Sequence, residues 1–216
     1  MHVSFLHWIL PAFRTGLRVP GLLIAGWALF ASVADLARAQ SSAPWIAGEF
    51  SFSDELGGFR ITSVTGKGTR DDPAHIKQVF DTTYDGTMVI RRIRPIVKEL
   101  KDAGLGASHG TVYMRIETFN HSNLSWVGFG FELQEVLNVV STYGDGLSFD
   151  QLSRQRNDVY SDRFLDFEDQ FEPGDRLVFT DGFVNNQTTV ETRFVITDFT
   201  PTRVFYLLQD PLIPAS

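Results

Sequence analysis

One local pattern in the sequence matches a catalytic motif. Residues 106–110 read Gly-Ala-Ser-His-Gly. This is the G-x-S-x-G pattern of serine hydrolases, in which the serine occupies a sharp turn from a strand into a helix, beside a histidine base and an oxyanion hole. Here the order is reversed, because the expected strand, 111–119, follows the motif. We therefore predict a glycine-rich turn and no catalysis. A hydrolase that uses Ser108 and His109 is the less favoured alternative.

Metal-ligating residues are present, but their spacing is not typical of metal sites. The histidines after residue 39 are His75, His109 and His121, and they form no H-x-H or H-x-x-x-H pair. Oxygen ligands of Ca²⁺ could come from an acidic stretch that is interrupted by arginines and lacks the calcium-loop pattern: Asp145, Asp150, Asp158, Asp162, Asp166, Glu168 and Asp169. We predict no cofactor, with a structural calcium ion as the alternative.

Two carboxylates could face each other across a predicted hairpin. Glu117 and Glu132 fall on consecutive expected strands, and glycosidases use a pair of carboxylates about 5–10 Å apart. Like charges placed directly opposite each other destabilise a sheet, so this register is disfavoured. We interpret both side chains as ordinary outward-facing residues of a half-exposed sheet.

A basic cluster is the first candidate for binding without catalysis. It consists of Arg91, Arg92 and Arg94, followed by Lys98 and Lys101, in a chain of 26 acidic and 19 basic residues. Such a cluster could meet an anionic glycan, a lipid headgroup or an acidic partner. Glu99 and Asp102 dilute it, however, and charge clusters are usually solvated surface.

Aromatic side chains are the second candidate. A platform for a sugar ring or a partner could be formed by Trp45, Trp126, Tyr143 and Tyr160. Trp126 precedes Gly128 and Gly130, so it could instead cover closely packed backbone. Residues 66–69, Gly-Lys-Gly-Thr, lack the spacing of a phosphate-binding loop and are predicted to form a turn.

The composition excludes several classes of protein. The chain has 216 residues, 43% apolar and 21% charged, with 19 Phe and no Cys. This apolar content is too high for a disordered chain, and a cysteine-free chain has neither disulfides nor thiolate metal sites. A net charge of −7 argues against a nucleic-acid partner, because phosphate neutralisation needs a basic surface.

Period-two patterning predicts the elements that must position these groups. Phe50 and Phe52 alternate with polar residues, and eight more segments read as strands: 59–64, 76–80, 87–93, 111–119, 127–133, 177–180, 190–198 and 204–208. Helix signals are limited to 95–103 and a turn around 150–154, and 154–169 is predicted to be a long connection. The sequence therefore predicts a mainly β protein with a single antiparallel sandwich, Ig-like or jelly-roll-like.

The first 39 residues have the order of a secretory signal. Arg14 and Arg18 precede an apolar run at 21–33, and Ala37-Arg38-Ala39 supplies a cleavage site. The run is shorter than the roughly 20 residues of a spanning helix, so cleavage is favoured over a retained anchor. The expected organisation is a leader, 1–39, and one domain, 40–216. Membrane contact is then expected only before cleavage.

A family resemblance rests on three segments. They read Glu-Thr-Phe-Asn-His-Ser-Asn-Leu-Ser-Trp-Val-Gly-Phe-Gly-Phe-Glu-Leu at 117–133, Phe-Glu-Pro-Gly-Asp-Arg-Leu-Val-Phe at 171–179 and Val-Phe-Tyr-Leu-Leu-Gln at 204–209. This layout resembles exported bacterial β-sandwich domains of the surface-anchor type, although the sorting tail of such domains is not expected here. The resemblance implies fold and export and no catalytic residues.

Taken together, these features favour a non-catalytic protein with a binding or structural role in the periplasm or at the cell surface. Its partner would be a protein or a cell-envelope glycan. The main alternative is a glycan-binding module that uses Trp126, Tyr143 or Tyr160.

Overall fold

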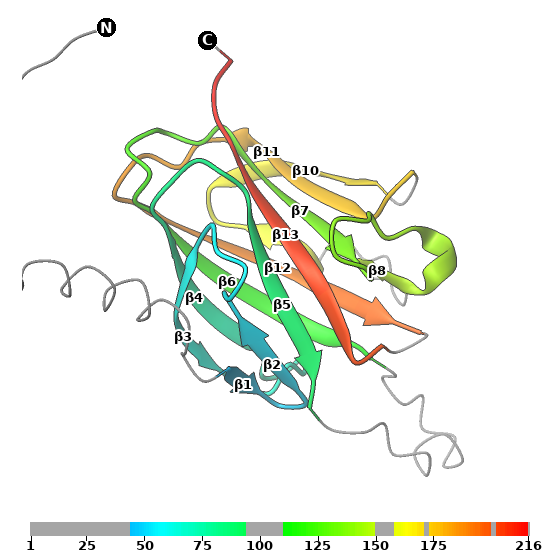
Figure 1. Ribbon diagram of the computed structural model, residues 1–216. Coiled ribbons are helices and arrows are strands. Elements are labelled where there is room, and N and C mark those ends of the chain that lie inside the picture. Colours follow the sequence, from blue (N-terminus) through cyan, green and yellow to red (C-terminus); the bar gives the residue numbers. More distant parts are fainter. Residues whose placement is uncertain (1–43, 94–109, 150–157, 171–172, 200–201, 216) are drawn as a thin grey trace, which may run out of the picture. The chain divides into compact units, whose positions relative to one another are not determined.

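The chain folds into two packed β-sheets (Figure 1). The computed structural model describes residues 44–93, 110–149, 158–170, 173–199 and 202–215. All of them belong to the second of two compact units, which spans Ser42–Ser216. Within these residues no helix is long and apolar enough to cross a membrane.

The larger sheet has seven strands, all antiparallel to their neighbours. In spatial order they are β1 (Trp45–Ala47), β2 (Phe50–Ser53), β5 (Gly86–Arg92), β13 (Val204–Leu212), β7 (Gly128–Gln134), β11 (Arg176–Gly182) and β10 (Phe164–Gln170). Long-range pairing dominates this sheet, since β5 and β7 both pair with the C-terminal strand β13.

The smaller sheet is mixed. Its order is β3 (Arg60–Thr65), β4 (Ala74–Phe80), β6 (Val112–Asn120), β12 (Thr189–Asp198) and β8 (Leu147–Phe149), with β9 (Tyr160–Ser161) also paired to β12. The pair β4–β6 is parallel, unlike the all-antiparallel arrangement expected from the sequence. A single turn of 3-10 helix, η2 (Tyr143–Asp145), precedes β8.

Alternation along the strands produces the core between the sheets. Every second residue of β6 is buried, beginning with Val112. Aromatic rings from both sheets interlock, with Phe131 4.7 Å from Phe194 and Phe80 5.7 Å from Phe129 between ring centroids. Each large apolar side chain buried in this way contributes roughly 1.5–3 kcal/mol. The predicted core of phenylalanines is confirmed.

One buried polar network also joins the two sheets. Gln78 Nε2 of β4 donates to Gln209 Oε1 of β13 at 2.6 Å and lies 2.9 Å from Thr118 Oγ1. Gln209 Nε2 returns a bond to Gln78 Oε1 at 3.3 Å. Because buried amides are costly unless hydrogen-bonded, this reciprocal pair fixes the alignment of the sheets at one end of the sandwich.

The structure corrects the prediction for 154–169. Where a long connection was expected, β9 pairs with β12 of the smaller sheet and β10 enters the larger one. The chain therefore crosses here from the smaller sheet to the larger one, through two strands. The burial pattern of β10 does not alternate, and its apolar Leu165 is 85% exposed, so no period-two signal marks this strand. The helical segments predicted at 95–103 and 150–154 lie outside the described residues.

Candidate functional site

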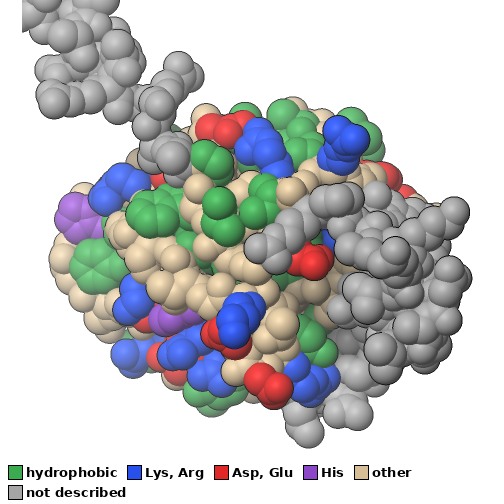
Figure 2. All heavy atoms as spheres, turned by 90° about the horizontal axis from the view of Figure 1, so that it is seen from below, with side chains coloured by type: hydrophobic (Ala, Val, Ile, Leu, Met, Phe, Trp, Pro, Cys, Tyr) green, Lys and Arg blue, Asp and Glu red, His purple; other side chains and the backbone are tan. Residues whose placement is uncertain are grey.

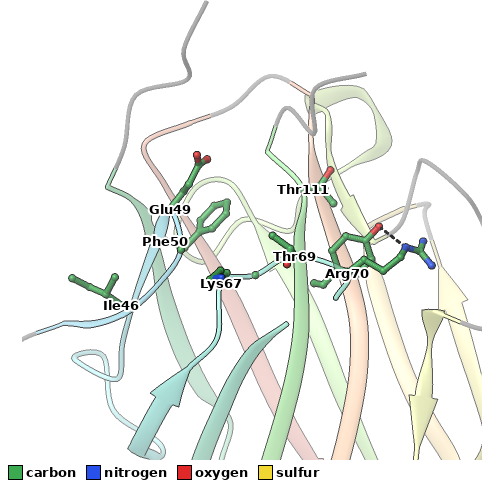
Figure 3. Close-up of a pocket in the computed structure, with 10 residues that line it drawn as sticks. Ile46, Glu49, Phe50, Lys67, Thr69, Arg70 and Thr111 are labelled. Carbon is green, nitrogen blue, oxygen red and sulfur yellow. Dashed lines mark hydrogen bonds between the residues drawn. The ribbon is translucent and has the colours of Figure 1, made fainter. Parts of the chain in front are cut away.

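A pocket of about 660 Å³ opens at one end of the sandwich (Figure 3). It lies where the β1–β2 turn, the β3–β4 loop and the start of β6 meet. The side chains that surround it are Ile46, Glu49, Phe50, Lys67, Thr69, Arg70, Thr111 and Tyr113, together with Gly48 and Gly68. The volume lies within the range of small-molecule sites.

Close backbone contact between two turns shapes this pocket. Gly48 has a φ of 59°, and a Cβ on it would lie 2.0 Å from the carbonyl oxygen of Lys67. Only glycine therefore lets the β1–β2 turn rest on the β3–β4 loop. That loop is closed by Asp72 O, which accepts from Lys67 N at 3.0 Å and Thr69 N at 3.1 Å. The turn predicted for 66–69 is confirmed, and both of these N–H groups are already used.

One wall of the pocket carries a fixed arginine. Arg70 lies over the ring of Tyr113 at 5.1 Å and donates from Nε to the phenol oxygen at 3.3 Å, the dashed line in Figure 3. Its terminal nitrogens bind Asp158 at 3.0 and 2.9 Å. Hydrogen bonding to Tyr113 and then to Asp158 raises the pKa of Arg70. Its charge is therefore permanent, and Asp158 balances it.

The two other charged groups of the pocket are not paired in this way. Lys67 and Glu49 are both exposed, and neither forms an ion pair within the described part of the chain. They come from the two turns that meet at Gly48, and Figure 3 draws Lys67 near the middle of the lining. Together they give the pocket one cationic and one anionic group that a ligand could engage.

The predicted basic cluster is divided by the sheet. Arg91 points outward and binds Glu55, with 3.2 Å between Nη1 and Oε2, and this hydrogen bond lowers the pKa of Glu55. Arg92 is instead at an inward position, with only 7% of its side chain exposed. Arg94 lies outside the described residues. The cluster is thus not one surface patch, because consecutive residues of β5 point to opposite faces.

The predicted aromatic platform is also not assembled on the surface. Trp126 is fully buried and donates from Nε1 to Ser122 Oγ at 3.1 Å, so its indole is not available to a surface ligand. Tyr160 is 47% exposed, with Arg193 5.3 Å above its ring. Tyr143 belongs to η2, and its side chain lies outside the description. Trp45 packs partly against the core.

The carboxylate pair suggested by the sequence is separated. Glu117 lies on β6 of the smaller sheet, where Lys77 Nζ approaches it at 3.1 Å. Glu132 lies on β7 of the larger sheet, 3.4 Å from Arg176 Nε. Since β6 and β7 belong to different sheets, the hairpin expected between them does not form.

The remaining catalytic and metal candidates are not gathered into a site. Ser108 and His109 lie outside the described residues. His121 Nδ1 contacts Asp81 at 2.7 Å, and His75 Nε2 lies 3.4 Å from Glu117. Asp145 accepts from Ser141 Oγ at 2.6 Å and caps the turn of η2. Among the residues with described positions, no group of three or more His, Asp or Glu could hold a metal ion.

Ion pairs across β6 and β12 cover part of the smaller sheet. The strand register places Glu117 opposite Glu191 and Arg115 opposite Arg193. Opposite charges offset these like pairs, because Glu191 accepts from Arg115 Nε diagonally across the strands at 2.8 Å and from Arg193 Nε along its own strand at 2.7 Å. Charges of both signs also lie side by side on the face shown in Figure 2.

This ladder makes stability depend on pH. Burial raises the pKa of Glu191, but the hydrogen bonds from Arg115 and Arg193 outweigh it, and the net shift is downward from 4.5. A carboxylate with a lowered pKa in the folded state stabilises at neutral pH, and this contribution is lost as the pH falls through that lowered value. Glu191→Gln is therefore expected to cost about 1 kcal/mol at pH 7. The difference from wild type should shrink below pH 4.5.

Urea unfolding of wild type and Glu191→Gln between pH 3 and pH 7 would measure this effect, with roughly unit steps of pH. Glu168→Gln on the exposed strand β10 is the matched control, and its difference from wild type should stay small throughout. A Glu191→Gln difference that is constant over this range would contradict the assignment.

Comparisons with protein-family models, curated proteins and solved structures found no match. The candidate site is therefore assigned from its own geometry. Sequence reasoning did not single out Glu49, Thr111 or Tyr113, because their strands and turns are joined only by the tertiary fold. Gly48 and the Gly-Lys-Gly-Thr turn were the local signals that could have indicated the pocket.

Proposed function

We propose that the protein is an exported, non-catalytic β-sandwich domain that binds a cell-envelope glycan in this pocket. The observation that carries the proposal is the lining itself. Three hydroxyl side chains, from Thr69, Thr111 and Tyr113, are combined with a carboxylate and an ammonium group around an open pocket. Hydroxyls both donate and accept, and a carboxylate accepts twice, which suits the paired hydroxyl groups of a sugar.

The pocket lining favours binding over catalysis. Among the lining residues that the structure describes, Glu49 is the sole carboxylate, whereas most glycosidases need two. None of these described side chains is an imidazole that could activate a hydroxyl. Tyr113 and Arg70 hold each other in place, so the wall is pre-organised for recognition.

Export is supported by the order of residues 1–39 and by the strand and turn segments that resemble surface-anchor domains. A chain without cysteine can fold outside the cytosol without oxidative help. After cleavage at Ala39, 177 residues would remain. Since the leader holds three of the 19 basic and one of the 26 acidic residues, their net charge would be −9.

The full chain, expressed with its own leader and recovered from the periplasm or medium, would test this proposal. Mass spectrometry is expected to place the first residue at Gln40. Calorimetry against a panel of neutral and acidic cell-envelope polysaccharides is expected to give saturable binding. Thr69→Trp, which fills the pocket from an exposed position, should remove that binding, whereas Thr180→Trp on exposed β11 should retain it.

Two results would overturn the proposal. One is a wild-type protein that binds no glycan of the panel. The other is binding that survives in Thr69→Trp, provided that this variant keeps the wild-type circular dichroism spectrum and unfolding midpoint.

A further inference from the structure

We infer that the glycan bound by this pocket is acidic, and that Lys67 recognises its carboxylate. The inference rests on the proposed function and specifies its ligand class. It starts from a difference between the two cations of the pocket. Arg70 is held by Asp158 through two hydrogen bonds, so its charge is already balanced. Lys67 has no acidic partner within the described residues and faces the same pocket.

The position of Lys67 is set by backbone contacts. Its N–H donates to Asp72 O at 3.0 Å. Its carbonyl oxygen packs against Gly48, where a Cβ would lie only 2.0 Å from that oxygen. The base of the side chain is therefore fixed between the two turns, while its ammonium group forms no ion pair with a residue that the structure describes. An ammonium group beside a partly enclosed surface attracts an anion more strongly than it would in open water, because the effective dielectric constant is lower there.

A carboxylate suits this cation better than a phosphate does. Phosphate sites normally combine a cation with several backbone N–H groups at a glycine-rich turn. In this turn the N–H groups of Lys67 and Thr69 are both bound to Asp72 O. What remains is one ammonium group and neighbouring hydroxyls, which is enough for a singly charged anion.

The second charged group orients the ligand. Glu49, on the adjacent turn, repels a carboxylate and accepts hydrogen bonds from hydroxyl groups. The attraction of Glu49 is one of the two that oppose the lowering of the pKa of Arg92 by burial, so the charge of Glu49 acts on this side of the pocket. A uronic acid residue would therefore place its carboxylate at Lys67 and its hydroxyls towards Glu49, Thr69 and Thr111.

The test compares tetragalacturonate with its fully methyl-esterified form, which has the same sugar chain without charge. Calorimetry on the exported protein at low salt is expected to show about tenfold tighter binding of the acid. Lys67→Gln should remove this preference and Lys67→Arg should retain it. Lys77→Gln is the matched control, because Lys77 is exposed on β4 outside the pocket. Added salt should weaken binding of the acid and leave the ester unchanged.

Equal affinity for acid and ester, or an acid preference that survives in Lys67→Gln, overturns the inference and leaves the proposed function intact. Failure of both compounds to bind also overturns it. The proposed function itself fails if the whole polysaccharide panel is not bound, or if glycan binding survives in a folded Thr69→Trp variant.

Discussion

Replacing Trp126 with alanine is expected to lower the free energy of unfolding by about 3–5 kcal/mol. The indole is fully buried, with ring centroids 5.5 Å from Phe129 and 5.9 Å from Phe80. Truncation removes these contacts and leaves a cavity where the segments before β7 and after β11 pair through Trp126 and Val184. It also deprives Ser122 Oγ of the indole N–H.

Denaturant unfolding followed by far-ultraviolet circular dichroism would measure the loss, since this signal does not depend on the removed fluorophore. Trp126→Phe should cost less, because it keeps most of the ring volume and loses the N–H donor. Tyr160→Ala is the surface control and should stay within about 0.5 kcal/mol of wild type. If Trp126→Ala unfolds at the wild-type midpoint, the indole is not part of the core. A surface role as a sugar platform would then regain support.

Strand positions could be predicted from the sequence because alternation is a local property. In β6 each apolar residue alternates with a polar one, so its buried face is visible without knowledge of the partner strands, and β7 alternates in sequence although all of its residues are buried. β10 could not be found in this way. It lies at the edge of its sheet, exposes Leu165 and carries acids on both of its faces. Nor does alternation reveal direction, so the parallel pair β4–β6 was not expected.

The site was less predictable than the fold, for two physical reasons. The pocket joins side chains from two turns and one strand end, and no short stretch of sequence contains that combination. The division of the basic cluster between two faces, in contrast, could have been predicted from the alternation of residues along β5. Met88 and Ile90 are buried on β5, so period two places Arg92 on the same inner face and Arg91 on the outer one.

The inward position of Arg92 leads to the second large effect. Arg92 Nη2 lies 3.9 Å from Asp198 Oδ2 on the opposite sheet, with 7% and 2% of the side chains exposed. Asp198→Asn is expected to lower the free energy of unfolding by about 3–5 kcal/mol, because it leaves a buried guanidinium without its main counter-charge. Burial already lowers the pKa of Arg92 despite the attraction of Asp198 and Glu49. Desolvation therefore dominates its energy in the folded protein.

The same balance predicts an asymmetry between the two partners. Arg92→Met removes the costly buried charge, and its apolar chain can still cover the ring of Phe50, which the guanidinium now does at 5.1 Å. Asp198 keeps the hydrogen bond from Thr202 N at 3.1 Å. Arg92→Met should therefore cost less than Asp198→Asn, and the double variant should be closer to wild type than Asp198→Asn alone. Unfolding of all four proteins at pH 7 gives the coupling energy. Equal losses for the two single variants, with additive loss in the double variant, would mean that the pair does not act as a buried ion pair between the sheets.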